Sequence, residues 1–266
     1  MPAARQRNLV HRIVRRVPGV QAAVRELRTR RNARQDLVTL DYAGAVIRMR
    51  PSSRRIASMR LAPVAKEPWT VDWIERSVRE GDVLYDIGAN VGDYALIAAK
   101  VGRKRAKVVA FEPGAATFAS LCENIVLNDE TDTVIPVPLV LGEASRMGTL
   151  GYSELQAGGA GHTLDAASSV YAQPVLVAAL DDLIERFGLP APTLVKLDVD
   201  GAEAAVLAGA ARSLARTELR SLIVEVETAN TDAVLQALAS FDLVERFDTR
   251  DGVPLPDVWY GVFERR

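Results

Sequence analysis

The sequence predicts an α/β fold, a mostly parallel sheet with helices on both faces. From Asp82 onward, short apolar runs alternate with longer helical ones, which is the order of strand–helix units in such folds. Glycines and acidic residues follow several of these strands directly, and ligands of open parallel sheets bind beyond the carboxyl ends of the strands. The 266 residues are 48% hydrophobic and 25% charged, enough apolar material for one large core and typical of a globular enzyme.

Composition also excludes several classes of protein. The single cysteine, Cys122, excludes an internal disulfide framework and a thiolate zinc site, and it predicts a reducing, cytoplasmic compartment. The only histidines are His11 and His162, so no histidine-based metal site is expected. No uncharged apolar run approaches the ~20 residues of a membrane helix, and the start of the chain has no apolar stretch typical of a secretory signal.

Residues 1–36 are predicted to form a basic helical arm. The first 35 residues carry ten Arg and one Glu, whereas the whole chain has a net charge of −1, so the remainder is acidic. Apolar residues recur at helical spacing, and Pro18-Gly19 divides the arm into two helices. The favoured interpretation is a solvated Arg face on an arm packed against its own domain or a second subunit; the alternative is contact with an anionic membrane surface. The acidic body argues against nucleic acid as a partner.

A β-hairpin and a linker are expected over residues 37–68, followed by the main domain over 69–266. The stretch 148–173, rich in Gly, Ala and Ser, is expected to be irregular. The strand at 134–141 holds Pro136 and Pro138, which places it at a sheet edge. Strands are expected at 83–87, 107–111, 134–141, 175–177, 194–198, 222–226, 244–247 and 259–263, and helices at 69–78, 94–101, 115–127, 180–187, after 201 and at 231–240.

The strongest motif is the loop that follows the first strand, from Asp86 to Gly92. Gly88 allows a sharp turn, and Gly92 lets the next helix start close to a ligand. The loop differs from the dinucleotide fingerprint because Asn90 stands where a bare middle glycine is needed beside a pyrophosphate. An acid ahead of the loop suits a cationic amino group instead, such as the methionine end of S-adenosyl-L-methionine.

The second motif, Phe111-Glu112-Pro113, closes the next strand. Glu112 follows Asp86 by one strand–helix–strand step, which places a carboxylate where it can accept both hydroxyl groups of a ribose. Hydrogen bonds to a charged group contribute about 1.5–3 kcal/mol each, so Glu112 is expected to be important for binding the cofactor. Pro113 is placed in the same cofactor site.

The third motif begins at the tip of the fourth strand, next to the first strand. Asp198 is expected to face the acceptor of the reaction, with Lys196 on the same strand face. Asp200 and Glu203 have two interpretations. They are either a helix-capping pair, with Asp200 at the N-cap, or part of the substrate site.

Taken together, these motifs resemble the FkbM-type methyltransferases that depend on S-adenosyl-L-methionine. The resemblance covers about residues 69–247 and rests on VLYDIGANVGDYALIAAK, FEP, LCENIVLN, LDDLIERFG, VKLDVDGAEAAVLAGA and SLIVEVE. It implies a Rossmann-like class I methyltransferase fold with a seven-stranded sheet in the order 3-2-1-4-5-7-6, which also puts the third strand at an edge. It further implies O-methylation of sugars, glycans or polyketide-like natural products. By position, the resemblance assigns Asp86, Gly88, Asn90 and Gly92 to the cofactor loop, Glu112 to the ribose, and Lys196, Asp198, Asp200, Gly201 and Glu203 to the motif after strand four. It also covers Asn124, whose role does not follow from the sequence.

A hydroxyl acceptor must lose its proton during methyl transfer, so a general base is expected. Asp198 is the first candidate and His162, in the Gly-rich segment, the second. Glu225 and Glu227 end the fifth strand and, with Asp198, would offer oxygen ligands to Mg²⁺. Strand alternation alone also accounts for two glutamates two residues apart, so no metal is predicted.

The sequence thus predicts an O-methyltransferase with a small-molecule or glycan hydroxyl acceptor. Two alternatives stay open. The first is a non-catalytic subunit that binds S-adenosyl-L-methionine, or acts as a scaffold, within a glycan or secondary-metabolite assembly. The second is an NAD(P)-dependent oxidoreductase, which is disfavoured because Asn90 replaces the middle glycine of the dinucleotide fingerprint. No motif identifies the acceptor. No motif determines the oligomeric state either, and a homo-oligomer stays open.

Overall fold

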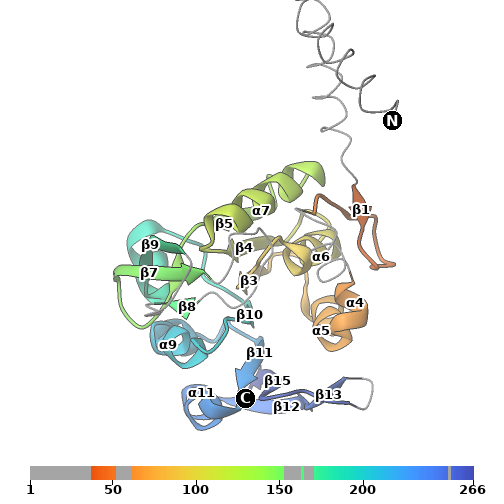
Figure 1. Cartoon of the computed structure of the whole chain (residues 1–266). Helices are drawn as coiled ribbons and strands as arrows, with labels where there is room; N and C mark the ends of the chain where they lie inside the picture. The colour runs from red at the N-terminus through yellow and green to blue at the C-terminus, as the bar shows by residue number, and fades with distance from the viewer. Residues whose placement is uncertain (1–36, 52–61, 153–162, 165–170, 251–252) are drawn as a thin grey trace, which may run out of the picture. The chain divides into compact units, whose positions relative to one another are not determined.

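The computed structural model describes residues 37–51, 62–152, 163–164, 171–250 and 253–266 (Figure 1). Predictions for the arm over residues 1–36 and for His162 lie outside these residues. Residues 38–266 form one compact unit. The predicted boundaries at residues 36 and 68 stay predictions. Within the described ranges, no helix has both the length and the apolar character needed to cross a membrane.

A seven-stranded sheet forms the centre of the molecule, in the order β12-β15-β11-β10-β3-β4-β5. All neighbouring strands run parallel except β15, which lies antiparallel to both β11 and β12. This is the class I methyltransferase topology, and β5, with Pro136, is at the edge as predicted. The strands are β3 (Val83–Ile87), β4 (Lys107–Phe111), β5 (Val134–Val137), β10 (Leu194–Leu197), β11 (Ser221–Glu227), β12 (Phe241–Phe247) and β15 (Val258–Arg265).

Each face of this sheet packs against its own group of helices and its own hydrophobic core. One core joins Leu84, Val108 and Ile223 to α5, α6 and α7; the other joins Tyr85, Val109 and Leu222 to helices from α8 onward. Since side chains alternate between the faces of a strand, each strand contributes to both cores. The helices are α4 (Pro63–Lys66), α5 (Pro68–Ser77), α6 (Asp93–Val101), α7 (Ala115–Leu127), α8 (Leu180–Phe187), α9 (Glu203–Ala208), α10 (Ala211–Leu214) and α11 (Thr231–Ala237), with a short 3₁₀ turn η1 (Thr228–Asn230).

The region expected to be irregular contains a second sheet, which corrects the prediction for residues 148–173. Four strands pair in the order β6-β9-β7-β8, namely β6 (Val140–Leu141), β7 (Arg146–Tyr152), β8 (Thr163–Leu164) and β9 (Tyr171–Ala178). The predicted strand over 134–141 is therefore two strands in different sheets. Glycines and alanines in β7 and β9 obscured the alternation of larger side chains that normally reveals a strand.

This second sheet supports the corner after β4. Gln173 donates from Nε2 to the carbonyl of Pro113 at 3.0 Å and accepts from the amide of Ala115 at 3.1 Å. The Tyr152 hydroxyl donates to the same Gln173 side chain. The backbone around Glu112 is therefore held from the side of the inserted strands.

The expected hairpin is present as β1 (Val38–Thr39) and β2 (Arg48–Met49), which pair antiparallel. Asn124 of α7 and Asn128, the residue that follows α7, hold the backbone at and after β2. Asn128 Oδ1 accepts from the amide of Arg48 and Asn124 Oδ1 from the amide of Arg50, both at 2.9 Å. Asn124 is fully buried and also donates to the carbonyl of Val91 at 2.9 Å. Asn124 thus joins the hairpin to the loop after β3, a structural role that the sequence did not reveal.

A smaller hairpin of β13 (Thr249–Arg250) and β14 (Val253–Pro254) lies between β12 and β15 in the chain.

Candidate active site

The loop after β3 lies at the carboxyl edge of the sheet, where β3, β4 and β10 end together. Gly88 and Ala89 donate from their amides to the carbonyl of Phe111 at 3.1 and 2.9 Å, which fixes the loop to the end of β4. Gly88 has φ +83°, and a Cβ there would lie 1.9 Å from the backbone oxygen of Asp198. Asn90 has φ 50°, in the left-handed region that asparagine tolerates. The loop therefore needs glycine at residue 88 and not at residue 90.

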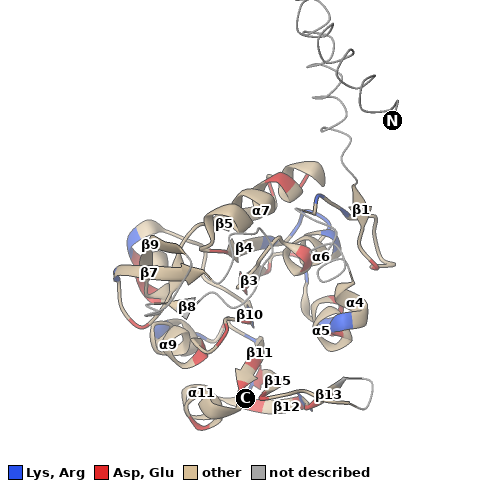
Figure 2. Ribbon diagram, in the orientation of Figure 1, with Lys and Arg blue, Asp and Glu red and all other residues tan. Residues whose placement is uncertain are grey.

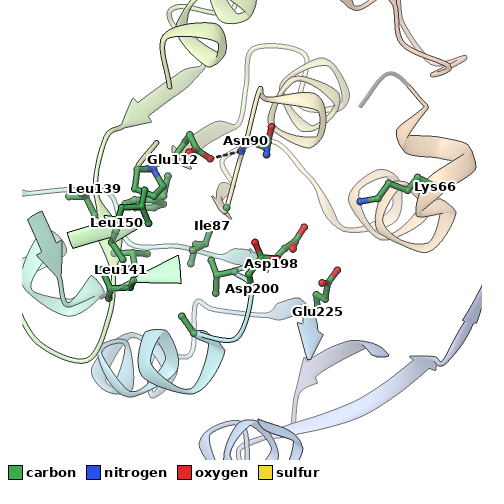
Figure 3. A pocket seen from close by; sticks show the side chains of 17 residues that line it. Lys66, Ile87, Asn90, Glu112, Leu139, Leu141, Leu150, Asp198, Asp200 and Glu225 are labelled. Atoms are coloured by element: carbon green, nitrogen blue, oxygen red, sulfur yellow. Dashed lines mark hydrogen bonds between the residues drawn. The ribbon is translucent and has the colours of Figure 1, made fainter. Parts of the chain in front are cut away.

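Glu112 connects the two cofactor loops predicted from the sequence. Its Oε2 accepts from the amide of Asn90 at 3.1 Å (Figure 3). Its Oε1 accepts from the amide of Gly114 at 2.7 Å. The side chain is 5% exposed, yet it lines the cavity at the end of β4. Two backbone donors orient this carboxylate before any ligand arrives, and a carboxylate oxygen can accept more than one hydrogen bond.

A buried lysine joins the tips of β3 and β10. Lys196 lies in register with Asp86 on the neighbouring strand, and its Nζ is 3.2 Å from Asp86 Oδ1 and 3.3 Å from Asp198 Oδ2. The Lys196 ammonium also lies 5.1 Å from the ring centroid of Tyr94. Burial by itself would lower the pKa of Lys196, but the carboxylates of Asp86 and Asp198 outweigh burial and raise it. Lys196 is therefore a permanent cation and not a proton acceptor.

The surroundings of Asp86 differ from the expected ones, which placed it in the cofactor loop. Its side chain is fully buried and is not among the residues that line the cavity. Burial raises the pKa of Asp86, and the Lys196 ammonium opposes that shift. The partner of Asp86 in the structure is thus Lys196, and direct contact of Asp86 with a cofactor stays a prediction.

Three carboxylates gather beside the tip of β10. One oxygen each of Glu67, Asp198 and Glu225 lies within 4.8 Å of the other two. Glu67 comes from the junction of α4 and α5 and pairs with the ammonium of Lys66, while the Tyr260 hydroxyl donates to Glu225 Oε2. Figure 2 shows acidic residues on the ribbon at the ends of β10 and β11. Burial, and next the charge of Asp198, raise the pKa of Glu225 to about 7.

The cavity has an apolar wall and an acidic wall. Figure 3 shows Leu139, Leu141 and Leu150 grouped on one side and Asp198, Asp200 and Glu225 on the other. Leu139 lies between β5 and β6, and the other two leucines belong to the second sheet. Asp198 and Asp200 follow β10, and Glu225 belongs to β11. Other lining residues are Lys66, Ile87, Gly88, Asn90, Phe111, Glu112, Pro113, Val140, Leu164, Val199 and Ala202.

The segment after β10 corrects the capping interpretation. The N-cap of α9 is Ala202, not Asp200, and no side chain caps it. Glu203 is buried and accepts from the amide of Gly201 at 3.0 Å and from Nδ2 of Asn230 at 2.8 Å. Glu203 therefore stiffens the loop, whereas Asp200 lines the cavity.

The structure brings together six of the predicted site residues along the cavity: Gly88, Asn90, Glu112, Pro113, Asp198 and Asp200. Four other predicted residues do not line the cavity: Asp86, Gly92, Lys196 and Glu203. Sequence reasoning missed Lys66 and Glu67, which belong to a segment taken for a linker, and the pair of Glu225 and Tyr260. The only signal for that pair was the run of acids at the end of β11, which suggested a metal ligand.

Comparisons with known proteins identify the family of this chain. Residues 86–247 match the family model described as the methyltransferase FkbM domain. The chain is 31% identical over 169 residues to hexuronic acid methyltransferase AglP of Haloferax volcanii, a match that covers 63% of this chain and 65% of the relative, just under two thirds of it.

Two solved structures with similar folds were also found. Precorrin-6y C5,15-methyltransferase from Geobacter metallireducens is 12% identical, with a TM-score of 0.46, over 75% of this chain and 86% of that one. An rRNA methylase from Streptococcus thermophilus is also 12% identical, with a TM-score of 0.46, over 74% of this chain and 94% of that one.

Two glycines with nearly the same φ provide a test of the loop geometry. Gly81 has φ +86°, and a Cβ added there would have nothing within 4 Å, so Gly81→Ala is expected to cost about 1–2 kcal/mol from φ alone. Gly88→Ala adds a collision with the Asp198 backbone and should cost clearly more. Urea unfolding of the two variants measures the difference; equal losses would contradict the close approach of β3 and β10.

Proposed function

This chain belongs to the FkbM methyltransferase family, and on that premise we propose that it transfers a methyl group to a hydroxyl of a sugar, a glycan or a polyketide-like natural product. The methyl donor of the family is S-adenosyl-L-methionine. The observation that carries the proposal is the wall of carboxylates, Asp198 and Glu225, facing the cavity that Gly88 and Glu112 also line.

The residues present fit the cofactor. Gly88 lines the cavity, and its close approach to the backbone of Asp198 fixes the position of the loop there. Glu112 would hold the ribose hydroxyl groups, since its carboxylate is already oriented by two amides. The leucines at residues 139, 141 and 150 would pack against an adenine ring. When bound, S-adenosyl-L-methionine supplies a methyl group on a sulfonium, which is activated for displacement.

The chain's own residues then have three tasks. The loop at Gly88 and Asn90, with Glu112, orients the donor, because alignment is the main requirement of an in-line displacement. Asp198 and Asp200 accept hydrogen bonds from the acceptor's hydroxyl groups. Lys196 keeps Asp198 in place from behind, which limits the positions that an acceptor oxygen can take.

The acidic wall favours a neutral hydroxyl group over an anionic acceptor. A substrate carboxylate placed among Glu67, Asp198 and Glu225 would meet like charges at short range, which is costly in a partly buried site. Hydroxyl groups instead donate to carboxylates. The relative AglP is named for a hexuronic acid, a sugar with both kinds of oxygen, and this supports a carbohydrate acceptor.

The test is methyl transfer from S-adenosyl-L-methionine carrying a ¹³C-methyl group to a panel of hexose and hexuronic acid glycosides. We expect labelled methyl ethers, which survive mild base. Labelled methyl esters, which mild base hydrolyses, would contradict the hydroxyl acceptor. Binding of S-adenosylhomocysteine without transfer to any glycoside would favour the non-catalytic subunit, and competition by NAD would favour the oxidoreductase.

The cofactor assignment predicts a specific loss in Glu112→Gln. The variant loses the charge and one acceptor oxygen, so S-adenosylhomocysteine should bind about 10–150-fold more weakly by calorimetry. Glu123→Gln, an exposed glutamate on α7, is the control and should bind as the wild type does. Equal affinities in the two variants would contradict a ribose contact at Glu112.

A further inference from the structure

The three carboxylates beside the tip of β10 carry more negative charge than the lysines in contact with them can balance. Glu67, Asp198 and Glu225 each place an oxygen within 4.8 Å of the other two. Like charges at this separation favour protonation of one member, because ionising all three costs electrostatic energy. The question is which of the three holds the exchangeable proton.

The positions of Lys66 and Lys196 distinguish the three carboxylates. Lys66 contacts Glu67, and Lys196 lies 3.3 Å from Asp198 and also pairs with Asp86. An ammonium beside a carboxylate stabilises the charged form and so makes it a weaker proton acceptor. Among the described residues, Glu225 forms no ion pair. It is the member of the three whose charge has no ammonium in contact.

The register of the sheet places Glu225 beside Asp198 at the cavity. Leu197 and Val224 are in register on β10 and β11, so the next residues along the chain, Asp198 after β10 and Glu225 within β11, lie side by side. On the other side, Glu225 is directly opposite Tyr260 of β15, whose hydroxyl donates to Oε2. Glu225 lines the cavity with Asp198 and Asp200. It is therefore held between two strands, with its carboxylate at the acceptor side of the site.

We propose that Glu225 is the catalytic base, the group that takes the proton from the acceptor hydroxyl, while Asp198 orients that hydroxyl. This inference rests on the proposed function. It departs from the sequence analysis, which named Asp198 as the first candidate and considered Glu225 only as a metal ligand.

Methyl transfer and the loss of the hydroxyl proton occur together in this site. The acceptor oxygen forms a bond to the methyl carbon as the carbon–sulfur bond breaks, and the electron pair of that bond stays on sulfur, giving a neutral thioether. The proton of the hydroxyl passes to a carboxylate oxygen of Glu225. Solvent then removes this proton when the product leaves.

The charge environment gives the reaction a pH dependence. The groups that face Glu225 are Asp198 from β10, Glu67 and Lys66 from the α4–α5 junction, and Tyr260 from β15. Burial and the Asp198 charge raise the pKa of Glu225 to about 7, whereas the hydrogen bond from Tyr260 opposes this rise. A base must be deprotonated to act, so kcat should fall as the pH drops below about 7.

The first experiment compares Glu225→Gln with Glu227→Gln, using the best hydroxyl acceptor of the glycoside panel. Glu227 is two residues further on the same strand but does not line the cavity. Glu225→Gln should lower kcat by about 10²–10⁴-fold and remove the acid limb of the pH profile. Its affinity for S-adenosylhomocysteine should stay at the wild-type value. Glu227→Gln should keep the wild-type kcat and pH profile.

Two further measurements separate a base from a structural carboxylate. Tyr260→Phe removes a donated hydrogen bond that stabilises the charged form, so its acid limb should move to higher pH. In full-length protein labelled with ¹³C at the glutamate carboxyl carbon, the Glu225 signal, assigned by its loss in Glu225→Gln, should titrate with a midpoint near 7 without any acceptor present.

Several results would overturn the inference. They are an unchanged kcat in Glu225→Gln, a carboxyl signal that titrates in the ordinary range of glutamate, or activity that is abolished by EDTA and restored by Mg²⁺. Failure of the proposed function appears differently, as no labelled ether from the wild-type enzyme. Failure of the inference appears as equal labelling by the wild type and Glu225→Gln.

Discussion

The buried ammonium of Lys196 is the interaction on which the rest of the site depends. It lies between Asp86 of β3 and Asp198, the residue that follows β10, with almost no exposure to solvent. Without it, the fully buried carboxylate of Asp86 would have no cation beside it and would lie near the carboxylate of Asp198, at a high electrostatic cost. With it, β3 and β10 can end side by side, and Gly88 can approach the backbone of Asp198 as closely as it does. The positions of the donor loop and of the acidic wall both follow from this arrangement.

The carboxyl edge of the sheet holds carboxylates in three different surroundings. Asp86 is enclosed and paired with a cation, so its charge serves the fold. Glu112 is oriented by the amides of Asn90 and Gly114, so its oxygens face the cavity with little conformational entropy left to lose. Among the described residues, Glu225 has the Tyr260 hydroxyl as its hydrogen-bond partner and no ammonium in ion-pair contact, and burial and the Asp198 charge raise its pKa. One residue type thus stabilises the core, binds a ligand or accepts a proton, according to the donors that surround it.

Much of this organisation could be predicted from the sequence. Apolar runs ending in glycine or acid located β3, β4, β10 and β11, and Pro136 placed β5 at the edge. The second sheet could not be found, because Gly148, Gly151 and Pro174 break the alternation that identifies a strand. The roles of Lys66 and Glu67 were hidden for another reason: they act through tertiary proximity to Asp198, which is far away in the chain. Local patterns identify strand ends, but the partners that tune their charges come from distant segments.

The central claim is that Lys196 and Asp86 are coupled, and a double-mutant cycle of unfolding free energies in urea tests it most directly. The set is the wild type, Asp86→Asn, Lys196→Met and the double variant. Lys196→Met alone leaves the buried carboxylate of Asp86 without its cation and should lower the free energy of unfolding by about 3–5 kcal/mol. The double variant should lose clearly less than the sum of the two single losses, because it removes both charges. Additive losses would contradict the claim, and so would a Lys196→Met variant as stable as the wild type.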